Sequence, residues 1–368
     1  ADGTTLGADN GIGVSMSMSA ATEKNVEHGP LELLFTADEE TGLTGAFGLE
    51  ERSLSAKYLL NLDSEESDSI YVGCAGGADC VAEFKIEKEK LNLKNAKQYN
   101  ILLHGLKGGH SGCDIHFGRA NAIKLIAELL RRLLGKFNTD SIKYWNFIGG
   151  NKRNAIPRES QITLLTDVKK EELQSIITQF VQDQLLEFKY TDGGLKVDLI
   201  EESVSKEYVY RDNFFQRIIK LLLCIPHGVI AMSPTMKCTT ETSTNMASIK
   251  IDESKDLMTF CKSQRSFINQ TINKISNSVK ACFELAGATK VIIGDGYPGW
   301  TPDPNSKLLS LVESTFKELS GCDPKILAIH AGLECGLLSG KLPDCQLISF
   351  GPTITGPHSP DEKVKIKD

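Results

Sequence analysis

The sequence predicts an α/β protein in which one α/β domain is interrupted by a second, α+β domain. Short apolar runs alternate with helical patterns towards both ends of the chain, whereas the middle shows the period-two alternation of antiparallel strands. At 368 residues the chain also exceeds the usual size of a single core. Roughly two domains are therefore expected.

The outer sections are predicted to alternate helix and strand. A stretch rich in small residues and methionine predicts the first helix, and short apolar runs predict the strands. The expected elements are helices over 12–25 and 305–319 and strands over 31–36, 57–62, 69–72, 325–329 and 345–350.

The middle section looks like two similar α+β units, although no sequence repeat is strong enough to prove a duplication. Its clearest element is 119–134, which has the apolar spacing of an amphipathic helix. The expected elements are strands near 81–86, 98–103, 142–149, 160–167, 196–201 and 246–251 and helices near 119–134, 170–187, 212–224 and 269–286.

The composition argues against nucleic-acid and membrane partners. A formal net charge of −7 disfavours a nucleic-acid surface. The longest apolar region, 218–232, is broken by Lys220, Pro226 and His227 and is too short to span a bilayer. The first residues lack the basic and apolar segments of a secretory signal. Ten cysteines occur without a Cys-x-x-Cys pair, so reduced thiols and a cytoplasmic location are expected.

Chemistry-bearing side chains stand at the ends of the expected elements. Glu39 and Glu40 follow the first apolar run, where paired carboxylates are costly unless a cation or catalysis needs them. Asp63 follows the second run, His358 lies beyond the last one, and Asp9 stands in a Gly-rich segment just before the first helix. Carboxylates and a histidine in these places indicate a metal site.

The residue types suit two divalent ions, which lie about 3.5–4 Å apart and are normally clamped by a bridging carboxylate plus outer Asp, Glu and His ligands. One of Glu39 and Glu40 can ligate while its neighbour takes a proton from water. A solvated turn is the simpler interpretation of the Asp-Glu-Glu triplet alone, and it weakens once the other candidates join it. All candidate ligands come from the two ends of the chain. The expected domains are therefore 1–78 together with 291–368, and an inserted domain over 79–290.

Six motifs occur in an order that resembles a known family. They are Asp-Glu-Glu-Thr-Gly (38–42), Asn-Leu-Asp-Ser-Glu-Glu (61–66), Gly-Gly-His-Ser-Gly (108–112), Arg-Asn-Ala-Ile-Pro-Arg-Glu (153–159), Ile-His-Ala-Gly-Leu-Glu-Cys-Gly (329–336) and Gly-Pro-His-Ser-Pro-Asp-Glu (356–362). Over essentially the whole chain they resemble the aminoacyl-histidine dipeptidases (Xaa-His or cytosol non-specific dipeptidases), within the di-zinc metallopeptidase group of carboxypeptidase G, aminoacylase and carnosinase. The resemblance implies a mixed-sheet zinc-peptidase catalytic domain with an inserted α+β lid domain, and hydrolysis of dipeptides.

The resemblance also implies a role for each metal-site residue. Asp9 would bridge two metals, with a cis peptide bond to the next residue, and Glu40 would be a ligand. Asp63 would complete one metal and His358 the other. Glu39 would be the general base that acts on metal-activated water. The implied cofactors are two divalent ions, zinc with manganese or cobalt as alternatives.

The inserted lid would supply further residues. His110 would stabilise the oxyanion, and Asn154, Arg265 and, from the catalytic domain, Gly332 would contact the substrate, with the guanidinium gripping its carboxylate. A donor placed where negative charge develops is worth about 3 kcal/mol. From the residues alone an ordinary loop histidine is an equal alternative for His110, because its flanking glycines support a functional histidine without excluding a structural one. Both a homodimer formed through the lid and a monomer fit this arrangement.

One departure from the family pattern keeps other functions open. The pattern has a His-x-Asp motif before the bridging aspartate, whereas only eight residues precede Asp9 here and none is histidine. A truncated chain with an impaired first metal site is therefore expected. The alternatives are an N-acyl amino acid amidohydrolase on the same site and a catalytically silent binding protein that keeps the fold. A dipeptidase needs an acceptor for the substrate's ammonium group, for which Glu334 is the candidate.

Overall fold

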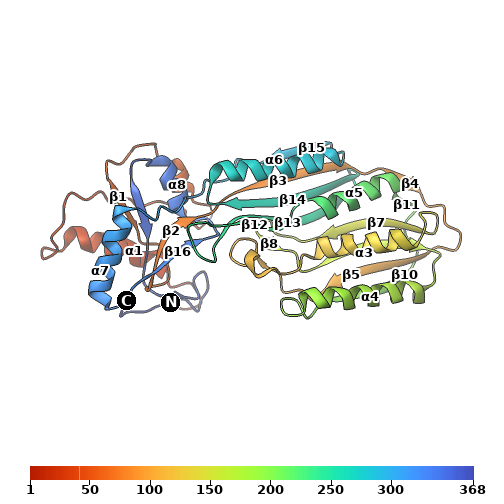
Figure 1. Cartoon of the computed structure of the whole chain (residues 1–368), viewed down its shortest axis with the longest axis horizontal. Coiled ribbons are helices and arrows are strands. Elements are labelled where there is room, and N and C mark those ends of the chain that lie inside the picture. The colour runs from red at the N-terminus through yellow and green to blue at the C-terminus, as the bar shows by residue number, and fades with distance from the viewer. Residues whose placement is uncertain (41) are drawn as a thin grey trace.

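The computed structural model describes residues 1–40 and 42–368, so Thr41 of the Asp-Glu-Glu-Thr-Gly motif lies outside the described residues. The molecule is elongated, with a smaller part that contains both chain ends and a larger part built on a long sheet (Figure 1). Among the described residues, no helix combines the length and the apolar character needed to cross a membrane.

The smaller part is built on a mixed sheet. Its strands are β1 (Tyr58–Asn61), β2 (Ser69–Cys74), β16 (Lys325–Ile329) and β17 (Gln346–Ser349), in the order β1-β17-β2-β16. β1 pairs with β17 and β2 with β16 in parallel, whereas β17 meets β2 antiparallel. The same part carries the helices α1 (Ala8–Thr22), α2 (Thr44–Gly48), α7 (Lys307–Ser320) and α8 (Glu334–Lys341) and the short paired strands β18 (Ile354–Thr355) and β19 (Lys363–Val364).

The larger part is one antiparallel sheet, with nine strands among the described residues. They are β3 (Gly76–Lys85), β5 (Lys97–His104), β7 (Ile142–Gly149), β9 (Ser160–Thr166), β10 (Lys196–Glu202), β12 (Gly228–Met232), β13 (Thr240–Asp252), β14 (Leu257–Ser266) and β15 (Lys290–Ile293). Eight follow the order β10-β5-β9-β7-β13-β14-β3-β15, and β12 pairs with β13. Short elements complete it: β4 (Lys88–Lys90) with β11 (Tyr208–Tyr210), β6 (Gly109–His110) with β8 (Ala155–Ile156), and the 3-10 helix η1 (Ile115–Phe117).

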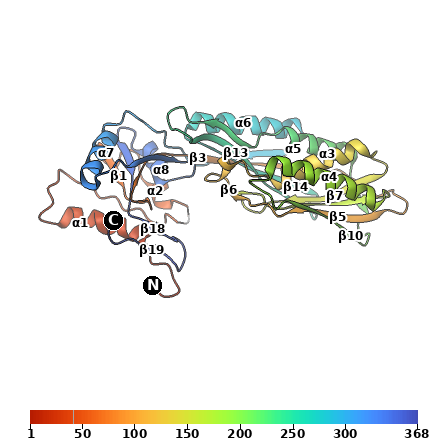
Figure 2. The ribbon, with the colours of Figure 1, turned by 60° about the horizontal axis from the view of Figure 1, so that its bottom comes forward.

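Four helices cover one face of the larger sheet: α3 (Ala122–Lys136), α4 (Lys170–Phe188), α5 (Asp212–Cys224) and α6 (Asn269–Leu285) (Figures 1 and 2). In α3, Ile123, Ile126 and Leu130 recur at helical spacing and are fully buried. Burying each such side chain contributes about 1.5–3 kcal/mol. The core of the larger part therefore lies between these helices and the sheet.

The chain crosses between the two parts twice, and the crossings pair with each other. Cys74 and Trp300 exchange backbone hydrogen bonds of 3.0 and 2.9 Å, and Gly77 and Tyr297 exchange two of 2.9 Å. A Cβ atom at Gly76 would lie 2.3 Å from the Gly299 nitrogen and 2.5 Å from the Tyr297 carbonyl oxygen. Only glycine lets the two crossings approach this closely.

Most of the predicted helices and strands are confirmed, with ends shifted by a few residues. The strand predicted over 31–36 is wrong, because this segment pairs with no described strand, and Leu31, Leu33 and Phe35 are 47, 43 and 50% exposed. The two α+β units of the middle section are not separate, since β7 and β13 join them into one sheet. The chain passes from the smaller sheet to the larger one at Ala75, and it leaves the larger sheet after Ile293. The domain boundaries at 78/79 and 290/291 stay a prediction.

Candidate metal centre and active site

Three of the predicted ligands, Asp9, Glu40 and His358, meet at one point of the smaller part. One ligand atom from each lies within 4.8 Å of the other two. His358 Nε2 is 3.0 Å from Asp9 Oδ2 and 3.0 Å from Glu40 Oε2. Because 349 positions separate Asp9 from His358 in the sequence, the fold alone brings them together.

Asp9 stands in an irregular first turn of α1. Gly7 precedes it with a left-handed φ of 76°, and Asp9 and Asn10 depart from helical dihedral angles. The peptide bond between Asp9 and Asn10 is cis, as the resemblance implies. Asn10 Oδ1 accepts the N–H group of Gly13 at 3.0 Å, which closes the turn.

The loop that carries Glu39 and Glu40 is closed onto the start of α2. Thr44 Oγ1 donates to Asp38 Oδ2 at 2.7 Å, and the N–H group of Gly45 donates to the Ala37 carbonyl at 2.9 Å. The two glutamates thus follow an unpaired segment and precede a short helix, rather than following a strand.

The carboxylates of this region are crowded. Burial, followed by the charges of Asp9 and Glu39, raises the pKa of Asp63 to about 8. Burial, followed by Glu40 and Asp9, raises the pKa of Glu39. At His358, desolvation opposes protonation, but Glu40 and Asp9 outweigh it and raise its pKa. Asp63 follows the end of β1, and the charges of Asp9, Glu39 and Glu40 help to raise its pKa. It is not part of the group formed by Asp9, Glu40 and His358.

Such a group fits a divalent cation. Like charges in a partly buried site destabilise one another, and a cation among them removes that cost. Carboxylate oxygens with one imidazole nitrogen are donors that zinc, manganese and cobalt all accept. Asp9, Glu40 and His358 are therefore able to hold a metal ion.

A second cluster lies where the larger part meets the smaller one. Arg265 Nη1 donates to the Tyr297 hydroxyl at 2.7 Å. A Cβ atom on Gly332 would lie 2.9 Å from the Tyr297 ring. A Cβ atom on Gly112 would lie 3.1 Å from His110 Cε1 and 3.2 Å from Arg265 Nε. His110, Arg265 and Gly332, far apart in sequence, are thus brought together.

The backbone around His110 sets its tautomer. The N–H groups of Cys113 and Gly112 donate to His110 Nδ1 at 3.0 and 3.3 Å. A neutral ring that accepts at Nδ1 carries its proton on Nε2. Desolvation and then Arg265 lower the pKa of His110, partly opposed by Asp114. At neutral pH the ring is therefore a neutral donor through Nε2.

Two residues of this cluster, Tyr297 and His330, are not among the site residues that the sequence predicts. His330 is 7% exposed, and its Nε2 lies 2.7 Å from Ser243 Oγ. Its only signal was its place in the motif that contains Gly332. Tyr297 gave no signal, because its role depends on the pairing of the two crossings. Asn154, by contrast, was predicted as a substrate contact. Its side chain is exposed, and its backbone carbonyl accepts the N–H group of Ser111 at 2.8 Å.

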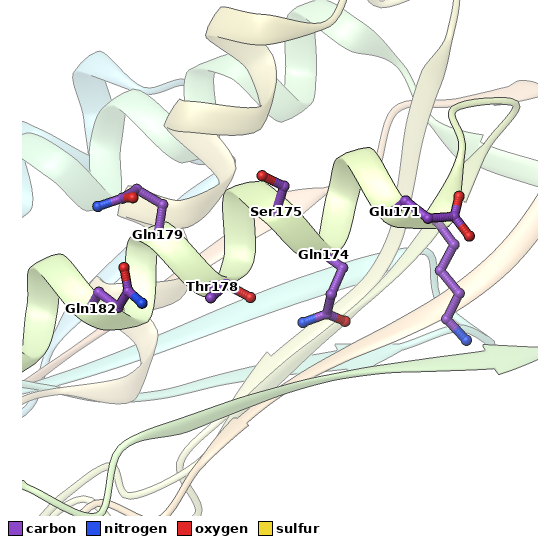
Figure 3. A pocket seen from close by; sticks show the side chains of 7 residues that line it. Glu171, Gln174, Ser175, Thr178, Gln179 and Gln182 are labelled. Atoms are coloured by element: carbon purple, nitrogen blue, oxygen red, sulfur yellow. The ribbon is translucent and has the colours of Figure 1, made fainter.

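A hollow of about 530 Å³ lies elsewhere, along α4 (Figure 3). Every residue that lines it belongs to this one helix: Lys170, Glu171, Gln174, Ser175, Thr178, Gln179 and Gln182. It contains no predicted site residue, so it is the outer surface of a helix rather than the active site.

A carboxylate–histidine group on loops of the smaller part, together with an Arg–His cluster of the larger part, is typical of a metal-dependent hydrolase. The chain belongs to the peptidase family M20/M25/M40, whose model matches residues 3–368. The family resemblance seen in the motifs is confirmed.

Two relatives illustrate the likeness. The cytosol non-specific dipeptidase of Escherichia coli K12 is 40% identical over 373 residues, which cover 100% of this chain and 74% of that protein. The crystal structure of aminoacylhistidine dipeptidase from Vibrio alginolyticus is 38% identical with a TM-score of 0.92, covering 99% of this chain and 73% of that one. The mixed-sheet peptidase fold is thereby confirmed.

Proposed function

We propose that this protein is a metallodipeptidase that hydrolyses the peptide bond of dipeptides, Xaa-His among them. The main support is that Asp9, Glu40 and His358 lie close enough together to bind one metal ion. The adjacent Glu39 is not part of this group, and its pKa is raised. The relatives named as non-specific and aminoacylhistidine dipeptidases support this substrate class.

The cofactor of the proposed reaction is a pair of divalent ions, zinc with manganese or cobalt as alternatives. Asp9, Glu40 and His358 would hold one ion, and Asp63 would join Asp9 at the other. When bound, the ions supply Lewis-acid chemistry that polarises the peptide carbonyl and lowers the pKa of water.

Glu39 moves the proton. Its carboxylate takes a proton from the attacking water and delivers it to the leaving amine, a transfer favoured by a pKa raised towards neutrality. His110 donates its Nε2–H to the oxygen on which negative charge develops. The low pKa of His110 keeps this proton arrangement at neutral pH.

The substrate ends are recognised by opposite charges. Arg265 is 8% exposed and its Nε has no hydrogen-bond partner among the described residues, so it is free to bind the carboxylate. We assign Asn154 and Gly332 to further substrate contacts. Glu334 is 9% exposed, and its Oε1 has no hydrogen-bond partner among the described residues. Its charge contributes to raising the pKa of Asp63. We assign Glu334 to the substrate's ammonium group, which favours a dipeptidase over an N-acyl amidohydrolase.

The larger part is the lid of this enzyme, and we extend the proposal to a homodimer formed through it in the cytoplasm. β12 pairs with β13 at the border of the sheet, and Val229, Ile230 and Met232 on it are 36, 45 and 50% exposed. Exposed apolar strands of this kind pair with other chains. Ile230→Lys should convert a dimer to a monomer in light scattering.

The test of the function is hydrolysis of a dipeptide panel by the full-length protein, with metal content measured on the same sample. Turnover of Xaa-His and other dipeptides that disappears with a chelator and returns with zinc is expected. Metal binding without hydrolysis of any dipeptide or N-acyl amino acid would instead indicate a silent binding protein. For Glu334→Gln, kcat/KM should fall for dipeptides and stay unchanged for N-acyl substrates.

A further inference from the structure

The carboxylate of Glu362 holds the start of α1 from the far end of the chain. Its Oε2 accepts the N–H group of Gly7 at 2.8 Å, and its Oε1 accepts the N–H group of Asp9 at 2.9 Å. Both oxygens are therefore used on the backbone that carries Asp9.

This contact supplies a cap that α1 lacks. Gly7 occupies the N-cap position, and it has no side chain to cap the helix. The first N–H groups of a helix need acceptors, and a negative charge is favoured there. Glu362 is 7% exposed, and the partners of its carboxylate among the described residues are backbone N–H groups. The N–H groups of Gly7 and Asp9 are thus among the backbone groups that stabilise its charge.

Glu362 also belongs to the turn that carries His358. Its own N–H group donates to the Ser359 carbonyl at 3.2 Å, and Ser359 Oγ donates to the Gly356 carbonyl at 2.7 Å. One hydrogen-bonded turn therefore carries both His358 and the carboxylate that binds the backbone of Asp9. The side chains of Asp9 and His358 end up 3.0 Å apart.

We propose that Glu362 is a positioning residue of the metal centre. Its carboxylate fixes the backbone of Gly7 and Asp9 on the His358 turn, and this sets the separation of the Asp9 and His358 ligand atoms. The inference rests on the proposed function in one respect, that Asp9 and His358 bind metal. Loss of an outer partner of a metal ligand typically costs 10–100-fold in affinity or activity.

Glu362→Gln tests the role, because it keeps the size of the side chain and removes its charge and one acceptor. Zinc affinity, measured with a competing chromophoric chelator and no substrate, should fall about 10–100-fold. Glu362→Asp, which keeps the charge, should recover part of the loss. Asp361→Asn is the matched control, since it removes the same charge from an exposed neighbour, and it should leave zinc affinity unchanged.

Hydrogen exchange of the metal-free full-length protein gives an independent readout. In Glu362→Gln the amides of 6–10 should exchange faster, while those of α3 keep their rates and show that the variant is folded. Unchanged exchange at 6–10, or unchanged zinc affinity, overturns the proposal. If the wild-type protein binds zinc but hydrolyses no dipeptide, the proposed function fails, and the two readouts still decide the role of Glu362.

Discussion

Glu39 and Glu40 are adjacent in the chain but have different surroundings. Glu40 contacts His358, whereas Glu39 is a partly buried carboxylate of raised pKa. In the full-length protein, Glu39→Gln should therefore lower kcat about 10²–10⁴-fold, the usual contribution of a positioned proton carrier, with bound metal unchanged. Glu40→Gln is the comparison, and it should lose metal. Metal loss in step with activity in Glu39→Gln would make Glu39 a ligand.

His110 should respond to its neighbour Arg265 in an NMR titration. Its pKa is lowered by desolvation and by Arg265, so it takes up a proton below the ordinary value of about 6.5. The unfolded chain binds this proton at higher pH than the folded protein, so His110 reduces stability as the pH falls through 6.5 towards its folded pKa. Arg265→Ala should move the imidazole midpoint upwards.

Arg217→Ala is the control for this titration, because it removes a partly exposed guanidinium of the larger part that pairs with Glu87. It should leave the His110 midpoint in place. A midpoint that stays fixed or falls in Arg265→Ala would mean that Arg265 does not act on His110.

Residue types and motif order were enough to nominate Asp9, Glu40 and His358, which the structure brings together. They could not nominate Tyr297 or His330. Their partners, Arg265 and Ser243, lie on strands of the larger sheet, so the contacts exist only once the two crossings have paired. The catalytic and ligand roles of all these residues stay predictions.

Among the elements, α3 depends on a buried cap. Asn121 is 3% exposed; its Oδ1 accepts the N–H groups of Ile123 and Lys124, and its Nδ2 donates to the Met246 carbonyl at 2.8 Å. Asn121→Ala loses a cap and leaves a buried carbonyl unpaired, so unfolding free energy in urea should fall about 2–4 kcal/mol. Asn138→Ala, in an exposed turn, should change it by no more than about 0.5 kcal/mol. Equal effects would show that the cap contributes nothing specific.

Elements were predictable where their apolar pattern is local. The helix predicted over 212–224 matches α5, whose buried stripe is visible in the sequence. β14 was missed because it buries polar side chains, among them Lys262, whose Nζ donates to the Pro226 carbonyl at 2.5 Å. Buried polar residues that form hydrogen bonds with distant partners do not produce the alternation of apolar and polar residues by which a strand is recognised in a sequence. The strand prediction for 31–36 was wrong for the opposite reason. This segment has an apolar pattern, but it pairs with no described strand.

At the scale of the whole molecule, the proposed chemistry is divided between the two parts. The candidate metal ligands lie on the smaller part, whereas His110, Asn154 and Arg265 lie on the larger one. The proposed catalysis is therefore expected to depend on how the two crossings hold the parts together, whereas metal binding is expected to be independent of it. This difference can be measured with a single substitution at Gly76.

Gly76→Ala would place a methyl group 2.3 Å from the Gly299 nitrogen, a contact with backbone that no side-chain rotation relieves. The crossings must then separate, at a cost of about 1–3 kcal/mol or more in stability. A shift near 1 Å in the placement of reacting groups costs about 10²-fold, so kcat/KM for dipeptides should fall by about that factor. Zinc affinity should stay at the wild-type value, because Asp9, Glu40 and His358 all lie in the smaller part. Gly135→Ala is the matched control: it faces open space on α3, and alanine there should be neutral or stabilise by up to about 1 kcal/mol. Loss of zinc affinity together with activity in Gly76→Ala would show that the crossings support the metal centre itself.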